Sequence, residues 1–397
     1  MGLLTPFMAL CSVEFFARLS YALARSPVLP LFALYLGAGP AAIGFAVGVS
    51  TVTGIFFKLP AGALSDVIGR KKTMLFGLVV FAIMPFTYLV IRNYQWLIVI
   101  RFIHGFATAI YGPVAMAIVA DKAGKSKGEM LSWFSSVTII GNLLGAPIGG
   151  YILHQSLRGS SPMMIDFQHA YLASGIMGIV ALILAIWTLP KDENIAKHSN
   201  LGEVFKKFFM GITEVLSDKR IAITSAMEGF QKMTVGALEA FLPIYAVMSA
   251  GLNEFQAGLL WAIQVVTTML SKPVMGKTSD KYGRKMLITL GLFLCAGAFA
   301  LFPVFKNFYA LMAVAAFFGL GEALVQSSGA AFVADLCKEK HFGTAMGTFG
   351  TIFDIGHATG PILVGILLAS HSYIFSFWAI SAMLFLATFL FIFNVKP

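Results

Sequence analysis

Charged residues lie within segments of the chain that are otherwise apolar, and four of them form two pairs with helical spacing. Glu14 precedes Arg18 by four residues, and Glu228 precedes Lys232 by four. Side chains at this spacing share one face of a helix, so each acid can neutralise its neighbouring base. Each pair therefore either binds a proton or a substrate, or only neutralises itself while stabilising its helix.

A third set of ionisable residues lies near the C-terminus and combines carboxylates with an imidazole. Glu322 has no obvious local partner, whereas Asp354 and His357 are three residues apart and share a helix face. An acid beside an imidazole can pass a proton or hold a cation, although a purely structural hydrogen bond explains the spacing equally well. For Glu322 we expect coupling or substrate contact. Glu239 and Arg25 either contact substrate or lie near the outer surface.

The composition predicts an all-α membrane protein. Of the 397 residues 58% are hydrophobic and 12% charged, and the mean hydropathy is +0.84. Soluble domains carry about 25% charged residues, and one helical span of a bilayer needs about 20 apolar residues. We predict twelve transmembrane helices, at residues 4–37, 41–63, 73–92, 95–119, 129–154, 168–189, 219–250, 255–277, 286–305, 307–334, 342–369 and 371–395.

One long polar stretch divides these helices into two sets of six. We therefore predict an N-terminal bundle at 1–189, a linker at 190–218 and a C-terminal bundle at 219–397. The linker is long enough for a short amphipathic helix at Val204–Ile212.

The positive charge of the chain follows its predicted topology. The net charge is +10, and most of the 28 Lys and Arg residues fall in the connections on one side of the helices, the side that also holds the linker. Because such connections stay on the cytoplasmic side, we place both termini and the linker in the cytoplasm, in the plasma membrane or, for a bacterial protein, the inner membrane. The charge then serves orientation and attraction to lipid head groups, and is not a nucleic-acid footprint.

The two halves repeat one another at a constant offset. Residues 65–72 read SDVIGRKK, and residues 279–286 read SDKYGRKM, 214 positions later. Glu14 maps onto Glu228 and Arg18 onto Lys232 at the same offset, as does Val-Ala-Asp at 119–121 onto 333–335. Parallel six-helix repeats with a binding site between them are a known transporter architecture.

The repeated phrase resembles the loop signature G-x-L-x-D-x-x-G-R-K of the major facilitator superfamily. The first copy runs from Gly62 to Lys71 and the second from Gly276 to Lys285, with Thr278 in place of the leucine. The resemblance implies two six-helix bundles that rock around a central site, with the first and seventh helices lining the cavity. It also implies a loop that latches one conformation, formed by Gly62, Asp66, Gly69, Arg70 and Lys71 and, in the second copy, Asp280, Gly283 and Arg284.

Two further motifs are similar to those of the drug and metabolite:proton antiporters of about 400 residues. Leu97-x-x-x-Arg101-x-x-x-Gly105 resembles a fourth-helix motif of proton-coupled members, with His104 where glutamine is frequent. Arg101 otherwise extends to the interface. The run from 141 to 150 resembles a fifth-helix antiporter motif, with its proline one place late. It implies a helix that flexes or seals through Gly141, Gly145, Pro147, Gly149 and Gly150.

These observations predict a secondary transporter that works by alternating access, as a monomer. We expect proton-coupled export of a small, partly apolar organic molecule. Proton-coupled uptake of a metabolite and uncoupled facilitated diffusion are the alternatives. A membrane enzyme is disfavoured because the chain has no HExxH, CxxC or GxSxG motif, and its three cysteines have no metal or disulfide spacing. We expect no metal and no cofactor. A channel is disfavoured because duplicated halves with a latch are more natural in a carrier.

Overall fold

The computed structural model describes residues 4–123, 126–155, 162–189, 202, 206, 209–210, 213, 217–336 and 342–395. Throughout these ranges the regular structure is helical, as expected where a chain must satisfy its own backbone hydrogen bonds in hydrocarbon. The helices of the first half are α1 (Leu4–Leu23), α2 (Val28–Tyr35), α3 (Pro40–Ile68), α4 (Arg70–Thr87), α5 (Tyr94–Lys122), α6 (Lys127–Gln155) and α7 (Met164–Thr188). Those of the second half are α9 (Lys219–Ile244), α10 (Glu254–Tyr282), α11 (Arg284–Leu301), α12 (Phe308–Leu336), α13 (Phe342–Leu368) and α14 (Tyr373–Asn394).

The first predicted helix, 4–37, is wrong as a single element. The structure divides it into α1 and α2, with residues 24–27 between them. Pro27 has no N–H to donate, and a proline disfavours the helical conformation of the residue before it, here Ser26. The amphipathic helix predicted at Val204–Ile212 lies outside the described residues, apart from single positions.

The two copies of the signature lie within helices and not in the long connections that the sequence suggested. α3 continues to Ile68 and α4 begins at Arg70, so Gly69 alone joins them; Gly283 alone joins α10 to α11. Gly69 has φ +111° and Gly283 has φ +93°, a region that side chains with a Cβ rarely adopt. A single glycine can therefore reverse the chain between two long helices.

The internal repeat extends to the helix boundaries. Adding 214 to the bounds of α3, α4 and α5 gives the bounds of α10, α11 and α12. The short 3-10 turn Tyr88–Val90 after α4 recurs in the same way as Phe302–Val304 after α11. One six-helix plan therefore occurs twice, although the second copy has its own feature, a π-helical turn at Tyr245–Ser249 after α9.

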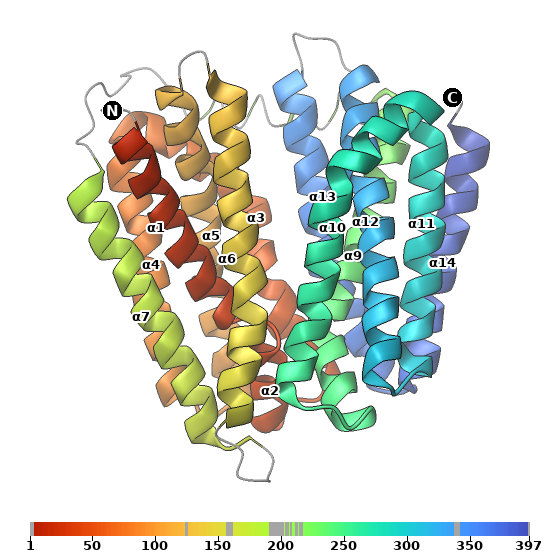
Figure 1. Cartoon of the computed structure of the whole chain (residues 1–397), viewed down its shortest axis with the longest axis horizontal. Coiled ribbons are helices and arrows are strands. Elements are labelled where there is room, and N and C mark those ends of the chain that lie inside the picture. Colours follow the sequence, from red (N-terminus) through yellow and green to blue (C-terminus); the bar gives the residue numbers. More distant parts are fainter. Residues whose placement is uncertain are drawn as a thin grey trace. The chain divides into compact units, whose positions relative to one another are not determined.

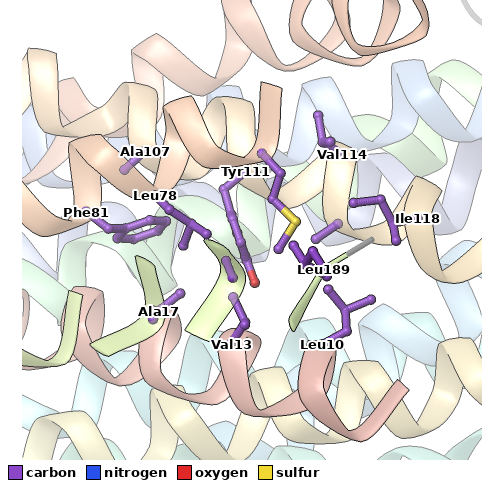
Figure 2. Packing of buried hydrophobic residues seen from close by; sticks show 14 of the residues in the cluster. Leu10, Val13, Ala17, Leu78, Phe81, Ala107, Tyr111, Val114, Ile118 and Leu189 are labelled. Carbon is purple, nitrogen blue, oxygen red and sulfur yellow. The ribbon is translucent and has the colours of Figure 1, made fainter. Parts of the chain in front are cut away.

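Within each half the same helices pack together. α1 packs against α6 and α7, and α4 packs against α5 and α7; in the second half α9 packs against α13, and α11 against α12 and α14 (Figure 1). The core of the first half is a buried cluster in which Tyr111 of α5 extends toward Val13 of α1, beside Leu10 (Figure 2). Aromatic and aliphatic side chains from α1, α4, α5, α6 and α7 complete it.

The chain divides into two compact units. Unit 1 comprises residues 1–37 and 49–205, and unit 2 comprises 38–48 and 206–397. The first turns of α3 are thus grouped with unit 2, where a Cβ on Gly44 would collide with the Pro361 carbonyl oxygen of α13. The division at 190–218 stays a prediction.

Eleven helical stretches among the described residues are long and apolar enough to cross a membrane. One of them, Pro6–Tyr35, combines α1 and α2. The remaining helix of the twelve, α9, is less apolar because it carries Glu228, Gln231, Lys232 and Glu239, all of which it buries. Hydropathy alone therefore gives the weakest signal for the helix with the most buried polar groups.

The glycine that joins α10 to α11 gives a stability prediction. Gly283→Ala places a Cβ on a backbone at φ +93° and is expected to cost about 1–3 kcal/mol. The matched control is Gly276→Ala, two turns earlier in α10, where no atom lies within 4 Å of the added Cβ. Thermal unfolding of the purified protein should show a lower Tm for Gly283→Ala and none of that loss for Gly276→Ala. Equal Tm values for the two variants would contradict the strain argument.

Candidate functional site

The arginine and lysine of the first signature connect three helices of unit 1. Arg70 donates from Nη1 to Ser65 Oγ at 2.6 Å and from Nε to Asp121 Oδ2, at the end of α5, at 3.1 Å. Lys71 donates to the carbonyl oxygens of Ile186 and Leu189, at the C-terminal end of α7. A cation at the negative end of a helix is favourable. The α3–α4 junction is thereby attached to both α5 and α7.

The second signature makes the same contacts in unit 2. Arg284 donates to Ser279 Oγ at 2.5 Å and to Asp335 Oδ2 at 3.1 Å, and Lys285 donates to the Ile392 carbonyl oxygen of α14 at 2.8 Å. Arg284 also forms an ion pair with Asp280. We call these two contact sets the signature clamps. The side chain of Asp66, which corresponds to Asp280, lies outside the described part of the structure.

Glu14 and Arg18 form the ion pair that their spacing predicts. Arg18 Nε lies 2.7 Å from Glu14 Oε1, and Glu14 is fully buried. The same oxygen accepts a hydrogen bond of 2.5 Å from Thr138 of α6. The Arg18 guanidinium lies 5.8 Å from the Tyr111 ring centroid, a cation–π contact. This pair therefore joins α1 to α5 and α6 as well as neutralising itself.

Arg101 lies buried inside unit 1, which excludes the alternative that it extends to the membrane interface. It is fully buried, donates from Nη2 to Ser50 Oγ at 2.7 Å, and lies 5.6 Å from the Tyr21 ring centroid. His104, one turn further along α5, shares a hydrogen bond of 3.0 Å between Nδ1 and the Tyr88 hydroxyl. Hydroxyl groups and aromatic faces surround this cation, and the described residues give it no carboxylate.

In unit 2 the structure pairs Lys232 with Glu322, and not with Glu228 as the spacing suggested. Lys232 Nζ lies 2.5 Å from Glu322 Oε1, and both side chains are buried. Gln326 donates to the same oxygen at 2.7 Å. Gln264 and Thr268 of α10 donate to Oε2 at 2.7 and 3.1 Å. The partner that Glu322 lacks locally thus comes from α9, where the Lys232 ammonium also lies 4.4 Å from the Phe353 ring centroid.

Glu228 is buried at 2% exposure, and its Oε2 has no hydrogen-bond partner among the described residues. It lies against α12, where a Cβ on Gly329 would stand 3.4 Å from that oxygen. The carboxylate therefore occupies a confined space in which the partner predicted for it is bound to another acid.

His357 is brought to a carboxylate on α9. Its Nε2 lies 3.4 Å from Glu239 Oε2, and Glu239 is buried. Asp354, one turn earlier on α13, is also buried. Glu239 was one of the two residues whose position the sequence left open, and its burial places it in the interior of unit 2.

The glycines of α6 lie against α1. A Cβ on Gly141 would stand 2.8 Å from the Arg18 Cβ, and one on Gly145 would collide with the Ala22 Cβ. At Gly149 the distance to Val28 Cγ2 would be 3.0 Å. α6 continues through Pro147 to Gln155, and Gly150 is buried. The spacing of four residues thus provides close helix packing; flexing of α6 stays a prediction.

Sequence reasoning missed the neutral partners of these charges. They are Thr138, Ser50, Tyr21, Tyr88, Gln264, Thr268 and Gln326. Glutamines inside apolar helices were a usable signal, because an unpaired amide in hydrocarbon is costly. The Val-Ala-Asp repeat was another, since its aspartates, Asp121 and Asp335, complete the signature clamps. Among the described residues no three His, Cys, Asp or Glu side chains group as metal ligands.

Comparison with known proteins identifies the family. The family model described as Major Facilitator Superfamily matches residues 10–264 and 233–397. The chain belongs to the major facilitator superfamily. It is therefore a transporter and not an enzyme, and its twelve helices form the fold of that family.

Named relatives include multidrug pumps. The multi-drug resistance efflux pump PmrA of Streptococcus pneumoniae is 26% identical over 89% of this chain and 87% of its own length. The quinolone resistance protein NorA of Staphylococcus aureus is 21% identical over 87% of this chain and 85% of its own. Among solved structures, a D323A mutant of the nucleoside transporter NupG has a TM-score of 0.82, with 15% identity over 98% of this chain and 100% of that one. This last similarity concerns the fold.

The signature clamps give a test of the latch that the family resemblance implies for Asp66. Asp66→Asn keeps Arg70 on Ser65 and Asp121, so Tm should change little. Transport should fall several-fold, and spin-label distance distributions between the two units should shift toward one open side. The same change in the second copy, Asp280→Asn, leaves Arg284 on Ser279 and Asp335, and comparison of the two variants shows which copy acts as a latch. Unaltered distance distributions in Asp66→Asn would contradict the latch and leave the signature with a structural role alone.

Proposed function

We propose that this carrier exports a small, partly apolar organic molecule in exchange for protons. The observation that carries the proposal is the burial of carboxylates inside both helical units, at Glu14, Glu228 and Glu322. Ionisable groups at membrane depth have a stability cost and usually mark ion or substrate pathways. The names of PmrA and NorA as an efflux pump and a resistance protein support the outward direction.

The mechanism we propose is alternating access of the two bundles around a site built from their polar groups. A coupling carboxylate binds a proton in one access state and releases it in the other, because water access and the nearest cation change between the two. The candidates for coupling or for the substrate cavity are Glu14, Arg18, Arg101, His104, Glu228, Lys232, Glu322, Asp354 and His357. The carrier works as a monomer in this proposal.

Proton-coupled uptake is the second candidate function. The same architecture supports it, since the fold is similar to that of a nucleoside transporter at 15% identity. Flux direction in inverted vesicles under an imposed proton gradient separates the two. Export requires accumulation of the substrate inside inverted vesicles that are acidified within, whereas uptake into right-side-out vesicles would overturn it.

The coupling proposal predicts that substrate exchange separates from gradient-driven flux. The variants are Glu14→Gln, Glu228→Gln, Glu322→Gln and Asp354→Asn, reconstituted into liposomes with norfloxacin as the probe. At least one should lose transport driven by a pH gradient while keeping counterflow exchange, because substrate still binds and the bundles still move. Glu129→Gln, at an exposed position of α6, is the matched control. Full gradient-driven transport in all four variants would instead favour facilitated diffusion or another coupling ion.

The charge distribution predicts the orientation of the chain, with both termini in the cytoplasm of the cell. In a background without the native cysteines, Lys281→Cys and Lys306→Cys place one thiol beyond each end of α11, both at exposed positions. A membrane-impermeant thiol reagent should label Lys306→Cys in intact cells and leave Lys281→Cys unlabelled. Lysis should make both reactive. Labelling of Lys281→Cys in intact cells would contradict the orientation.

A further inference from the structure

We infer that Glu228 carries the coupling proton in unit 2, whereas Glu322 and Lys232 remain a permanent internal ion pair. The inference rests on the proposed proton coupling and assigns different roles to two acids that the sequence made equivalent candidates. It follows from counting the hydrogen-bond donors around each carboxyl group.

Glu322 is surrounded by hydrogen-bond donors. Its Oε1 accepts from Lys232 Nζ at 2.5 Å and Gln326 Nε2 at 2.7 Å. Its Oε2 accepts from Gln264 Nε2 at 2.7 Å and Thr268 Oγ1 at 3.1 Å. A carboxylate offers about four lone-pair sites, and an ammonium or an amide nitrogen donates but cannot accept. A proton on Oε1 would displace Lys232 or Gln326. At Oε2 the committed donor is Gln264, because the single hydrogen of the Thr268 hydroxyl is also within reach of the Gln264 and Gly319 carbonyl oxygens. An ammonium and two amide donors therefore favour the charged form of Glu322.

Lys232 acts as a tethered counter-ion for that charge. Its side chain is 3% exposed, and its ammonium lies between Glu322 and the face of the Phe353 ring, 4.4 Å from the centroid. Carboxylate on one side and an aromatic face on the other stabilise a desolvated cation. Removing either member of such a buried pair leaves an uncompensated charge and is strongly destabilising. The pair is therefore expected to persist through the transport cycle.

Glu228 is the opposite case. It is 2% exposed, and Oε2 accepts no hydrogen bond from any described residue. Oε2 of Glu228 therefore has room for a proton, and among the described residues no cation forms an ion pair with Glu228 as Lys232 does with Glu322. A bare charge there lacks the donors that Glu322 has, so Glu228 should release its proton only when the open state admits water. Each cycle then needs one binding step and one release step: the carboxylate takes a proton from water on one side, and the carboxylic acid returns it on the other.

The groups that act on Glu228 come from several helices. Lys232 lies one turn away on α9, Glu322 faces it from α12, and Lys272 acts on it from α10. α13 contributes Asp354 and His357 to the interior of the same unit, where His357 contacts Glu239 and not Glu228. α11 contributes Cys295, which accepts a hydrogen bond from Gln231 at 3.8 Å.

Infrared difference spectroscopy of the purified protein between acidic and alkaline pH tests the assignment without a substrate. Protonation of a buried carboxyl gives a separate C=O stretching band. Wild type should show a band that Glu228→Gln removes. The double variant Lys232→Met with Glu322→Gln should keep it, because it removes the ion pair and leaves Glu228. A band that survives Glu228→Gln and disappears in the double variant would overturn the inference.

Thermal unfolding tests the permanence of the pair. Glu322→Gln and Lys232→Met should each lower Tm by several degrees, because each leaves one buried charge alone. The double variant should recover most of that loss, and Glu228→Gln should stay near wild type. A double variant as unstable as the sum of its parents would overturn the ion-pair argument.

Norfloxacin flux in liposomes separates failure of the inference from failure of the proposed function. Wild type should show gradient-driven flux, and Glu228→Gln should keep exchange alone. Gradient-driven flux in Glu228→Gln would overturn the inference while leaving proton coupling intact. Absence of any pH-driven flux in wild type would overturn the proposed function on which the inference rests, even if the infrared band is assigned to Glu228.

Discussion

Hydrocarbon offers no water to satisfy a polar group, so every charge inside a membrane-spanning bundle needs a partner from the protein. This constraint determines the interior of both units. Glu14 accepts from Arg18 and Thr138, and Arg101 lies between Ser50 and the Tyr21 ring. Glu322 accepts from Lys232, Gln326 and Gln264, with the Thr268 hydroxyl close by. Each of these charged side chains has at least one partner on another helix, so the polar contacts also determine which helices lie together.

The signature phrase satisfies the same constraint at the helix ends. Gly69 and Gly283 reverse the chain in one residue, which leaves the carbonyl and amide groups of two long helices close together. The following Arg and Lys then bind an aspartate at the end of one neighbouring helix and the terminal carbonyls of another. Positive charge at this end of the bundle therefore has a structural role in addition to its effect on orientation. The signature occurs twice because the same helix junction occurs once in each half of the chain.

The sequence predicted the number of helices, the family and the repeat because these depend on local hydropathy and on a fixed offset. Boundaries near Gly69 and Gly283 were less accurate, because the charged signature phrases suggested long connections, whereas the helices continue through them to a single glycine. The break at 24–27 was missed because apolar segments flank Arg25, Ser26 and Pro27 on both sides and were joined into one long helix. Pairing across helices could not be predicted: Lys232 and Glu322 are 90 residues apart, and only packing of α9 near α12 brings them together, so the local Glu228–Lys232 spacing suggested a pair that does not form.

The two units share the same arrangement of helices but differ in how their buried charged and polar side chains pair. Ser50 and Gln264 are 214 positions apart, and each forms a hydrogen bond with a buried charged side chain of its own unit. The neighbouring helix approaches each of them closely at a glycine: a Cβ on Gly105 would stand 2.5 Å from the Ser50 carbonyl oxygen, and one on Gly319 2.5 Å from that of Gln264. Yet the charge that Ser50 binds is a cation on α5, and the one that Gln264 binds is an anion on α12. Glu14 keeps the base one turn along its helix, whereas Glu228 loses the equivalent base to Glu322. Because the junctions are alike and the interiors are not, duplication accounts for the scaffold and divergence for the charges. Glu228 kept its position after the duplication, whereas its counter-ion Lys232 now pairs with Glu322. Among the residues that the structure describes, Glu228 is therefore an acid of unit 2 whose charge no ion pair fixes.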